Sequence, residues 1–144
     1  MTDSDRETLV RARLIVGALI GGVLILTALS GWMPRFDGME GLVVPAAVVG
    51  AASPAVAFRL YQLMRDRLTP TATATRRREA FLRANVIAFA ITEGAAMFGV
   101  IVFALTGSPL ALIGVLMHVL LGGALWPTEE KLAGFVGGAA RDDF

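Results

Sequence analysis

The chain has 144 residues, of which 56% are hydrophobic and only 17% are charged. Because soluble domains carry about 25% charged residues, this composition excludes a disordered chain and disfavours a water-soluble globule. The net charge of +1 gives no excess basicity for a nucleic-acid partner. With no cysteine and a single histidine, the sequence excludes disulfides, thiolate metal sites and histidine-cluster metal sites.

Four apolar stretches follow one another along the chain: residues 14–32, 41–61, 84–105 and, shorter than the others, 109–126. A helix needs roughly 20 mostly apolar residues to cross the hydrocarbon core of a membrane. The runs are continuous and not alternating, which favours helices over a β-barrel. The sequence therefore predicts one all-α integral membrane domain, residues 1–144, with four transmembrane helices.

Short polar elements flank these spans. Ser4 and Glu7 predict a capping box at the start of the first helix. Arg11 and Arg13 precede an apolar run as in a signal peptide, but we expect this run to remain as the first span. After the fourth span, residues 127–130 predict a new helix start. We expect this short C-terminal helix to lie on the inner membrane interface through its apolar face, Leu132, Phe135 and Val136.

Basic residues fall almost entirely on one side of the predicted bundle. That side carries Arg6, Arg11, Arg13, Arg65, Arg67, Arg76, Arg77, Arg78, Lys131 and Arg141, and the other side has only Arg35. This asymmetry predicts a multi-pass protein of the cell membrane with both termini in the cytoplasm. Arg76, Arg77 and Arg78 are candidates for binding anionic lipid headgroups, at about 1 kcal/mol per charge. The alternative is that they serve only as a positive-inside anchor.

The first and third spans share a frame. Residues 11–15 resemble residues 83–87, residues 28–31 resemble residues 104–107, and a proline follows shortly in both cases. This similarity favours two parallel hairpin repeats, one made of the first two spans and one of the last two. The alternative is chance similarity between apolar helices.

Two titratable side chains and one hydroxyl fall at depth in the spans. Glu93 lies near the middle of the third span, where a charge costs about 2.5–3.5 kcal/mol. Ser53, beside Pro54, falls at a similar depth in the second span, and His118 lies about one turn nearer the outside. Glu93, Ser53 and His118 are therefore candidates for an ion-carrying group. The alternatives are a structural carboxyl between helices and a neutral histidine with one hydrogen-bond partner.

His118 also belongs to a short pattern with Gly114, four residues earlier. This Gly-x-x-x-His spacing resembles the pigment site of light-harvesting polypeptides. The resemblance implies axial ligation of a haem or a chlorophyll at His118, as a minor alternative to the expectation of no cofactor.

The third span contains a second resemblance. Residues 90–104, AITEGAAMFGVIVFA, resemble the carboxylate-bearing helix of the c subunit of rotary ATP synthases, where a glutamate is followed six residues later by Gly-Val and an apolar run. The resemblance implies an ion-carrying role for Glu93. The chain departs from the c subunit in three ways: the second span lacks a glycine repeat, the polar loop is longer, and the acid lies on the first helix of its hairpin.

Small residues at helical spacing indicate close helix packing. Gly17 and Gly21 form a Gly-x-x-x-Gly face, and Ala95 and Gly99 repeat the spacing. These faces serve contacts either within the bundle or with other subunits. No nucleophile is placed with a base, so we do not expect an enzyme.

The expected function is that of a small non-catalytic integral membrane subunit that packs into a larger energy-transducing membrane complex. Its expected partners are membrane lipid and other membrane subunits or copies of itself. The alternative is a proton- or ion-carrying membrane protein that uses Glu93, either c-subunit-like or a small transporter. The minor alternative is pigment or haem binding through His118.

Overall fold

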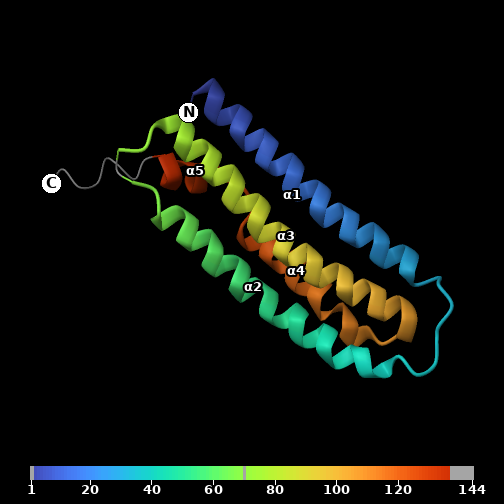
Figure 1. Ribbon diagram of the computed structural model, residues 1–144. Coiled ribbons are helices and arrows are strands. Elements are labelled where there is room, and N and C mark those ends of the chain that lie inside the picture. Colours follow the sequence, from blue (N-terminus) through green and yellow to red (C-terminus); the bar gives the residue numbers. More distant parts are fainter. Residues whose placement is uncertain (1, 70, 137–144) are drawn as a thin grey trace.

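The computed structural model describes residues 2–69 and 71–136, which form an elongated helical bundle (Figure 1). In chain order the elements are α1 (Asp3–Ser30), η1 (Glu40–Leu42), α2 (Val43–Asp66), α3 (Ala74–Thr106), η2 (Pro109–Leu112), α4 (Ile113–Ala124) and α5 (Glu129–Val136). Arg141, which the sequence predicts to be cytoplasmic, lies outside the described residues. Residue 2, the α2–α3 connection and α5 lie at one end, here named the basic end (Figure 1).

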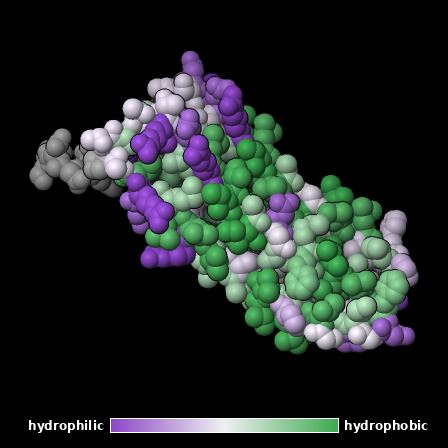
Figure 2. All heavy atoms as spheres, viewed as in Figure 1, coloured by the Kyte–Doolittle hydropathy of each residue, from purple (hydrophilic) through white to green (hydrophobic). Residues whose placement is uncertain are grey.

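Three helices in the described residues are long and apolar enough to cross a membrane. They are α1, α2 together with η1, and α3, and they agree with the first three predicted spans. The fourth predicted span, residues 109–126, differs. Its α-helical part is only 12 residues, and η2–α4 passes the same test only together with α5, from which it is bent by 71°. Figure 2 shows a hydrophobic band between two hydrophilic ends.

The longest helix, α3, occupies the centre of the bundle. It packs against α1, α2 and α4 along its length and against α5 at the basic end. In Figure 1, α1 and α2 lie on opposite sides of α3. The prediction of two hairpin repeats is therefore wrong for the first pair of spans. Residues 31–39 carry the chain past the end of α3, so α1 takes α3 as its main neighbour.

Glycines allow the closest approaches between the helices. A Cβ atom added at Gly50 of α2 would lie 2.5 Å from the backbone nitrogen of Gly114 in α4. A Cβ atom at Gly99 of α3 would collide with the carbonyl oxygen of Ala111 in η2. These contacts set the spacing of α4 from α2 and α3, since a side chain at either glycine would push backbones apart.

Helix starts differ from those predicted. The capping box of α1 is formed by Thr2 and Asp5: the Thr2 hydroxyl accepts from the Asp5 N–H, and the Asp5 carboxylate accepts from the Thr2 N–H. Ser4 lies inside the helix, so the predicted Ser4–Glu7 box is wrong. The third helix begins at residue 74, ten residues before the predicted span 84–105, because Thr73 caps it by accepting from the Arg76 N–H. The connection that precedes it starts after Asp66, where α2 ends.

The C-terminal helix α5 begins where predicted, after Thr128, whose hydroxyl accepts from the Lys131 N–H. Its apolar face is buried in the bundle and does not lie on the surface as expected, because Phe135 meets two aromatic rings edge-on. The ring centroids of Phe81 and Tyr61 lie 5.3 Å and 5.6 Å from that of Phe135. Leu132 is also buried, and Val136 is partly buried. The helix therefore closes the basic end of the bundle.

Candidate functional site: a buried polar layer and an outward carboxylate

His118 lies at the centre of the bundle and is fully buried. Its Nδ1 atom is 2.8 Å from the hydroxyl oxygen of Thr92 in α3. The Thr92 hydroxyl also lies 3.2 Å from the Phe89 carbonyl oxygen, so its single proton goes either to that carbonyl or to the ring. The other ring nitrogen, Nε2, is buried and has no hydrogen-bond partner among the described residues. The pair joins α4 to α3.

Ser53 lies at the same level as His118. Gly50 faces Gly114, and α2 and α4 run in the same direction, so Ser53 and His118 follow within three or four residues of this contact. The Ser53 hydroxyl, however, donates to the Gly50 carbonyl at 3.0 Å. That carbonyl has lost its usual helical partner because Pro54 has no N–H. The Gly50 carbonyl is thus satisfied within its own helix.

Glu93 lies apart from this buried layer. It follows Thr92 directly, and one step along an α-helix turns a side chain by about 100°. Its side chain is partly exposed and makes no hydrogen bond or ion pair with any described residue. The Asp5–Arg78 pair joins α1 to α3 across 73 residues. Because α1 and α3 run in the same direction, the same difference of 73 residues places Glu93 level with Ile20 of α1. Both residues lie near the middle of their helices.

The structure therefore does not bring the three predicted ion-carrying residues together. Ser53 and His118 share one buried level, whereas Glu93 is only partly buried and contacts neither of them through a hydrogen bond. The hydrophobic band in Figure 2 is interrupted at mid-length by a small hydrophilic patch. The internal polar layer thus lacks the carboxyl that an ion-carrying group through the bundle would need.

The surroundings of His118 do not fit a haem or a chlorophyll. The ring is 0% exposed, is held by Thr92, and packs edge-on against Phe89 with centroids 5.9 Å apart. One turn further along α4, a Cβ atom at Gly122 would lie 2.5 Å from the Ile20 side chain. A tetrapyrrole plane needs open space over Nε2, and this packing leaves none.

The predicted packing residues divide into two sets. Ala95 and Gly99 are buried inside the bundle: a Cβ atom at Gly114 would lie 2.9 Å from the Ala95 carbonyl oxygen, and Gly99 abuts η2. Their spacing therefore serves internal packing. Gly17 and Gly21 are only partly buried, and nothing lies within 4 Å of a Cβ atom added at either. Their face is left open by the rest of the described chain.

The arginine run is divided even more sharply, because consecutive helical residues point in different directions. Arg77 is 5% exposed, and its guanidinium donates to the carbonyls of Thr69, Ala72 and Phe135. Arg78 forms an ion pair with Asp5, with 2.7 Å between its Nε and a carboxylate oxygen. Only Arg76 of the three is exposed. The run is therefore not one lipid-binding surface.

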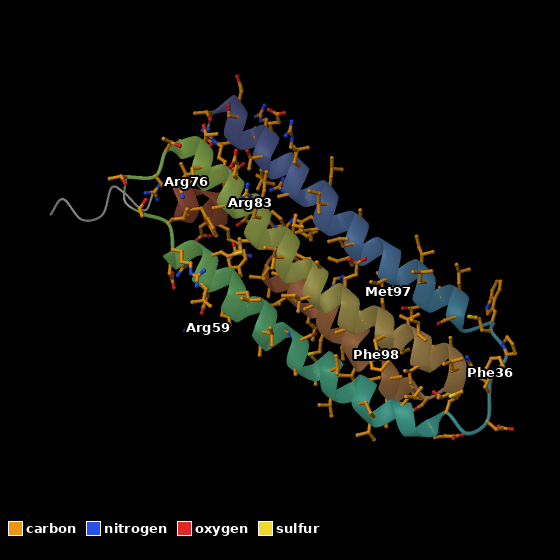
Figure 3. The ribbon with its side chains drawn as sticks, in the orientation of Figure 1. Phe36, Arg59, Arg76, Arg83, Met97 and Phe98 are labelled. Carbon is orange, nitrogen blue, oxygen red and sulfur yellow. The ribbon has the colours of Figure 1, made fainter. Side chains whose placement is uncertain are left out.

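A pocket at the basic end was not foreseen from the sequence. It has a volume of about 360 Å³ and lies between the end of α2 and the start of α3. Its lining residues are Met64, Arg67, Leu68, Thr69, Arg76, Glu79, Ala80 and Arg83. Figure 3 labels Arg76 and Arg83 on this part of α3. These two residues are seven positions apart and therefore share one face of the helix.

No protein-family model, curated protein or solved structure matches this chain. Among residues 2–69 and 71–136, no three His, Asp or Glu side chains are grouped so as to hold a metal ion.

Proposed function

We propose that the protein is a small non-catalytic subunit of a larger energy-transducing membrane assembly, with both termini in the cytoplasm. The hydrophobic band and the long apolar helices support insertion in a membrane. Arginines crowd the basic end, and Arg35 is the basic residue of the opposite connections. The positive-inside rule then assigns the basic end to the cytoplasm.

The observation that carries this proposal is that Glu93 is partly exposed and has no hydrogen-bond or ion-pair partner among the described residues. It lies at mid-helix. In lipid, a carboxyl at this depth is costly, and such groups almost always face protein or a water-filled cavity. A neighbouring subunit that covers Glu93 and offers it a hydrogen bond removes that cost. The chain by itself leaves this requirement unmet.

A second surface supports the same proposal. The Gly17–Gly21 face of α1 is open, and small residues let a helix from outside approach closely. We propose an energy-transducing assembly because residues 90–104 resemble the carboxylate-bearing helix of rotary ATP synthase c subunits.

Ion carrying by Glu93 is the second candidate, and one observation favours it. A carboxyl on the outside of its bundle, and not in its core, is accessible for proton exchange with a neighbouring protein surface. In this case the neighbouring protein exchanges protons with Glu93, and the contact is not only structural. Proton uptake into proteoliposomes that is present in the wild type and lost in Glu93→Gln would favour this candidate.

The test of the subunit proposal compares two substitutions on α3. Glu93→Leu removes the carboxyl without breaking a hydrogen bond or ion pair to any described residue, so the isolated chain should fold and lose its partner. Ile101→Leu is the matched control, because Ile101 is 53% exposed on the same helix. The measurement is native mass spectrometry of lipid nanodiscs cut directly from cell membranes. The wild type and the control should exceed the mass of one chain. A wild type that appears as a single chain would contradict the proposal.

A further inference from the structure

We propose that Arg67, Arg76 and Arg83 form a binding site for the phosphate of an anionic phospholipid. The three side chains line one pocket of about 360 Å³, one from the end of α2 and two from the start of α3. The proposal rests on the membrane placement given above. It differs from the sequence-based expectation, because Arg77 and Arg78 are not members of the site.

Two of these arginines have guanidinium groups without an intramolecular role. Arg67 and Arg76 are exposed, and neither side chain makes a hydrogen bond or ion pair with a described residue. The third, Arg83, has only an exposed contact with Glu79, with 3.9 Å between nitrogen and oxygen. By contrast, Arg11 pairs with Glu7 and Arg78 pairs with Asp5. The pocket thus gathers guanidinium donors that are free to bind an external anion.

The charge of the lining suits a phosphate group. Its lining residues carry three guanidinium groups and one carboxylate, that of Glu79, so the pocket is net positive. Guanidinium groups bind phosphate oxygens in a bidentate manner. The first turn of α3 adds the positive end of the helix dipole, with Thr73 as its N-cap.

The apolar residues in the pocket wall favour a lipid over free phosphate as the ligand. The pocket wall also contains Met64, Leu68 and Ala80, which offer apolar contacts to a glycerol backbone or the start of an acyl chain. Hydrophilic side chains gather at this end in Figure 2, directly beside the hydrophobic band. A ligand with an anionic head and an apolar tail matches both regions. Basic pockets between helices on the cytoplasmic side are typical of anionic-lipid sites.

Arg77 holds the rim of this pocket in place. Its guanidinium donates to the carbonyls of Thr69 and Ala72, on the connection between α2 and α3. Thr69 is itself a lining residue. Arg77, the buried arginine of the run, thus holds the loop in place beside Arg76, the exposed one.

The test titrates the full chain in mild detergent with fluorescent phosphatidylglycerol and with fluorescent phosphatidylcholine. Phosphatidylglycerol should bind more tightly. Arg67→Gln and Arg76→Gln should each weaken its binding roughly fivefold, the equivalent of about 1 kcal/mol per charge. The matched control is Arg59→Gln, because Arg59 is exposed on α2 near the same end but does not line the pocket (Figure 3). The control should stay within about twofold of the wild type, since its charge lies outside the site.

Glu79→Gln should act in the opposite direction. It removes the one carboxylate of the pocket and frees Arg83, so phosphatidylglycerol should bind more tightly than in the wild type. A diffuse attraction between a basic surface and an anionic micelle would respond to Arg59→Gln as much as to Arg76→Gln. That equality would overturn the proposal.

Competition with inorganic phosphate distinguishes a lipid phosphate from free phosphate as the bound anion. Chloride at equal ionic strength is the control. Phosphatidylglycerol binding that withstands millimolar phosphate supports a lipid site. Equal binding of the two lipids, together with arginine-dependent binding of inorganic phosphate, would show a soluble-phosphate site and overturn the lipid assignment. The assay uses the isolated chain and does not involve Glu93. A failure of the lipid-binding assay therefore does not contradict the subunit proposal. If the subunit proposal fails, the lipid-binding assay can still be interpreted.

Discussion

At the scale of single residues, Arg76 and Arg77 are neighbours with opposite surroundings. Arg77 is buried and donates to three backbone carbonyls, including that of Phe135 near the end of α5. Arg76 is exposed, and its side chain contacts no described hydrogen-bond partner. A lysine cannot reproduce the planar fork of donors at position 77, whereas position 76 makes no such demand.

We therefore expect Arg77→Lys to lower the free energy of unfolding by about 2–3 kcal/mol, because carbonyls at the basic end lose charged donors. Arg76→Lys should change it by less than about 0.5 kcal/mol. The measurement is unfolding of both variants and the wild type in the same mild detergent. Equal effects of the two substitutions would show that the contacts of Arg77 contribute nothing to stability.

The sequence predicted which polar residues lie at depth but not the direction of their side chains. Glu93 and Thr92 are adjacent, and their helix turns one outward and the other toward His118. Placement by depth alone made Glu93 the predicted neighbour of His118. The local bond from Ser53 to Gly50 is the kind that serine commonly makes three or four residues back, so it was predictable. The direction of the Glu93 side chain was not predictable, because it depends on where α1 packs against α3.

At the scale of helices, glycine pairs set the closest contacts. Gly99 and Gly94 both lie on α3, five residues apart, and differ in what a Cβ atom would meet. At Gly99 it would collide with a backbone oxygen of η2, and at Gly94 it would meet nothing within 4 Å. Backbone cannot move aside cheaply, so overpacking at Gly99 has to separate two elements.

Gly99→Ala should therefore destabilise the protein by on the order of 1–3 kcal/mol. Gly94→Ala should be neutral or stabilising by up to about 1 kcal/mol, since alanine is the better helix former. Thermal unfolding of both variants in one detergent checks the difference. If Gly94→Ala were the more damaging change, the packing of α3 against η2 described above would be wrong.

Hydropathy predicted the three long helices well because the apolar runs are long and continuous. It predicted helix ends poorly. The ten residues before position 84 include four arginines, two alanines, a glutamate and a leucine, which are good helix formers outside the apolar run, and Thr73 caps this segment. The destination of α5 also escaped prediction. Its apolar face suits a membrane surface and a protein surface equally, and the aromatic contacts of Phe135 decide between them.

At the scale of the whole molecule, the two ends have different chemistry. The basic end gathers the start of α1, the α2–α3 connection and α5, and the opposite end carries two connections with Arg35. Arg35 donates to the carbonyls of Ser30, Phe103 and Ala104, which links the ends of α1 and α3. Its charge is therefore used in packing, and the orientation follows from the arginines of the basic end.

The subunit proposal and the lipid site both depend on this bundle crossing the membrane with its basic end in the cytoplasm. The chain has no cysteine, so single cysteines report without background. We place them at Asp37, in the connection between α1 and η1, and at Thr71, which is exposed and spares the cap at Thr73.

The measurement is labelling of intact cells with a membrane-impermeant maleimide, before and after permeabilisation. Asp37→Cys should label in intact cells, and Thr71→Cys should label only after permeabilisation. Labelling of both cysteines in intact cells, or of Thr71→Cys alone, would contradict the placement on which this account rests.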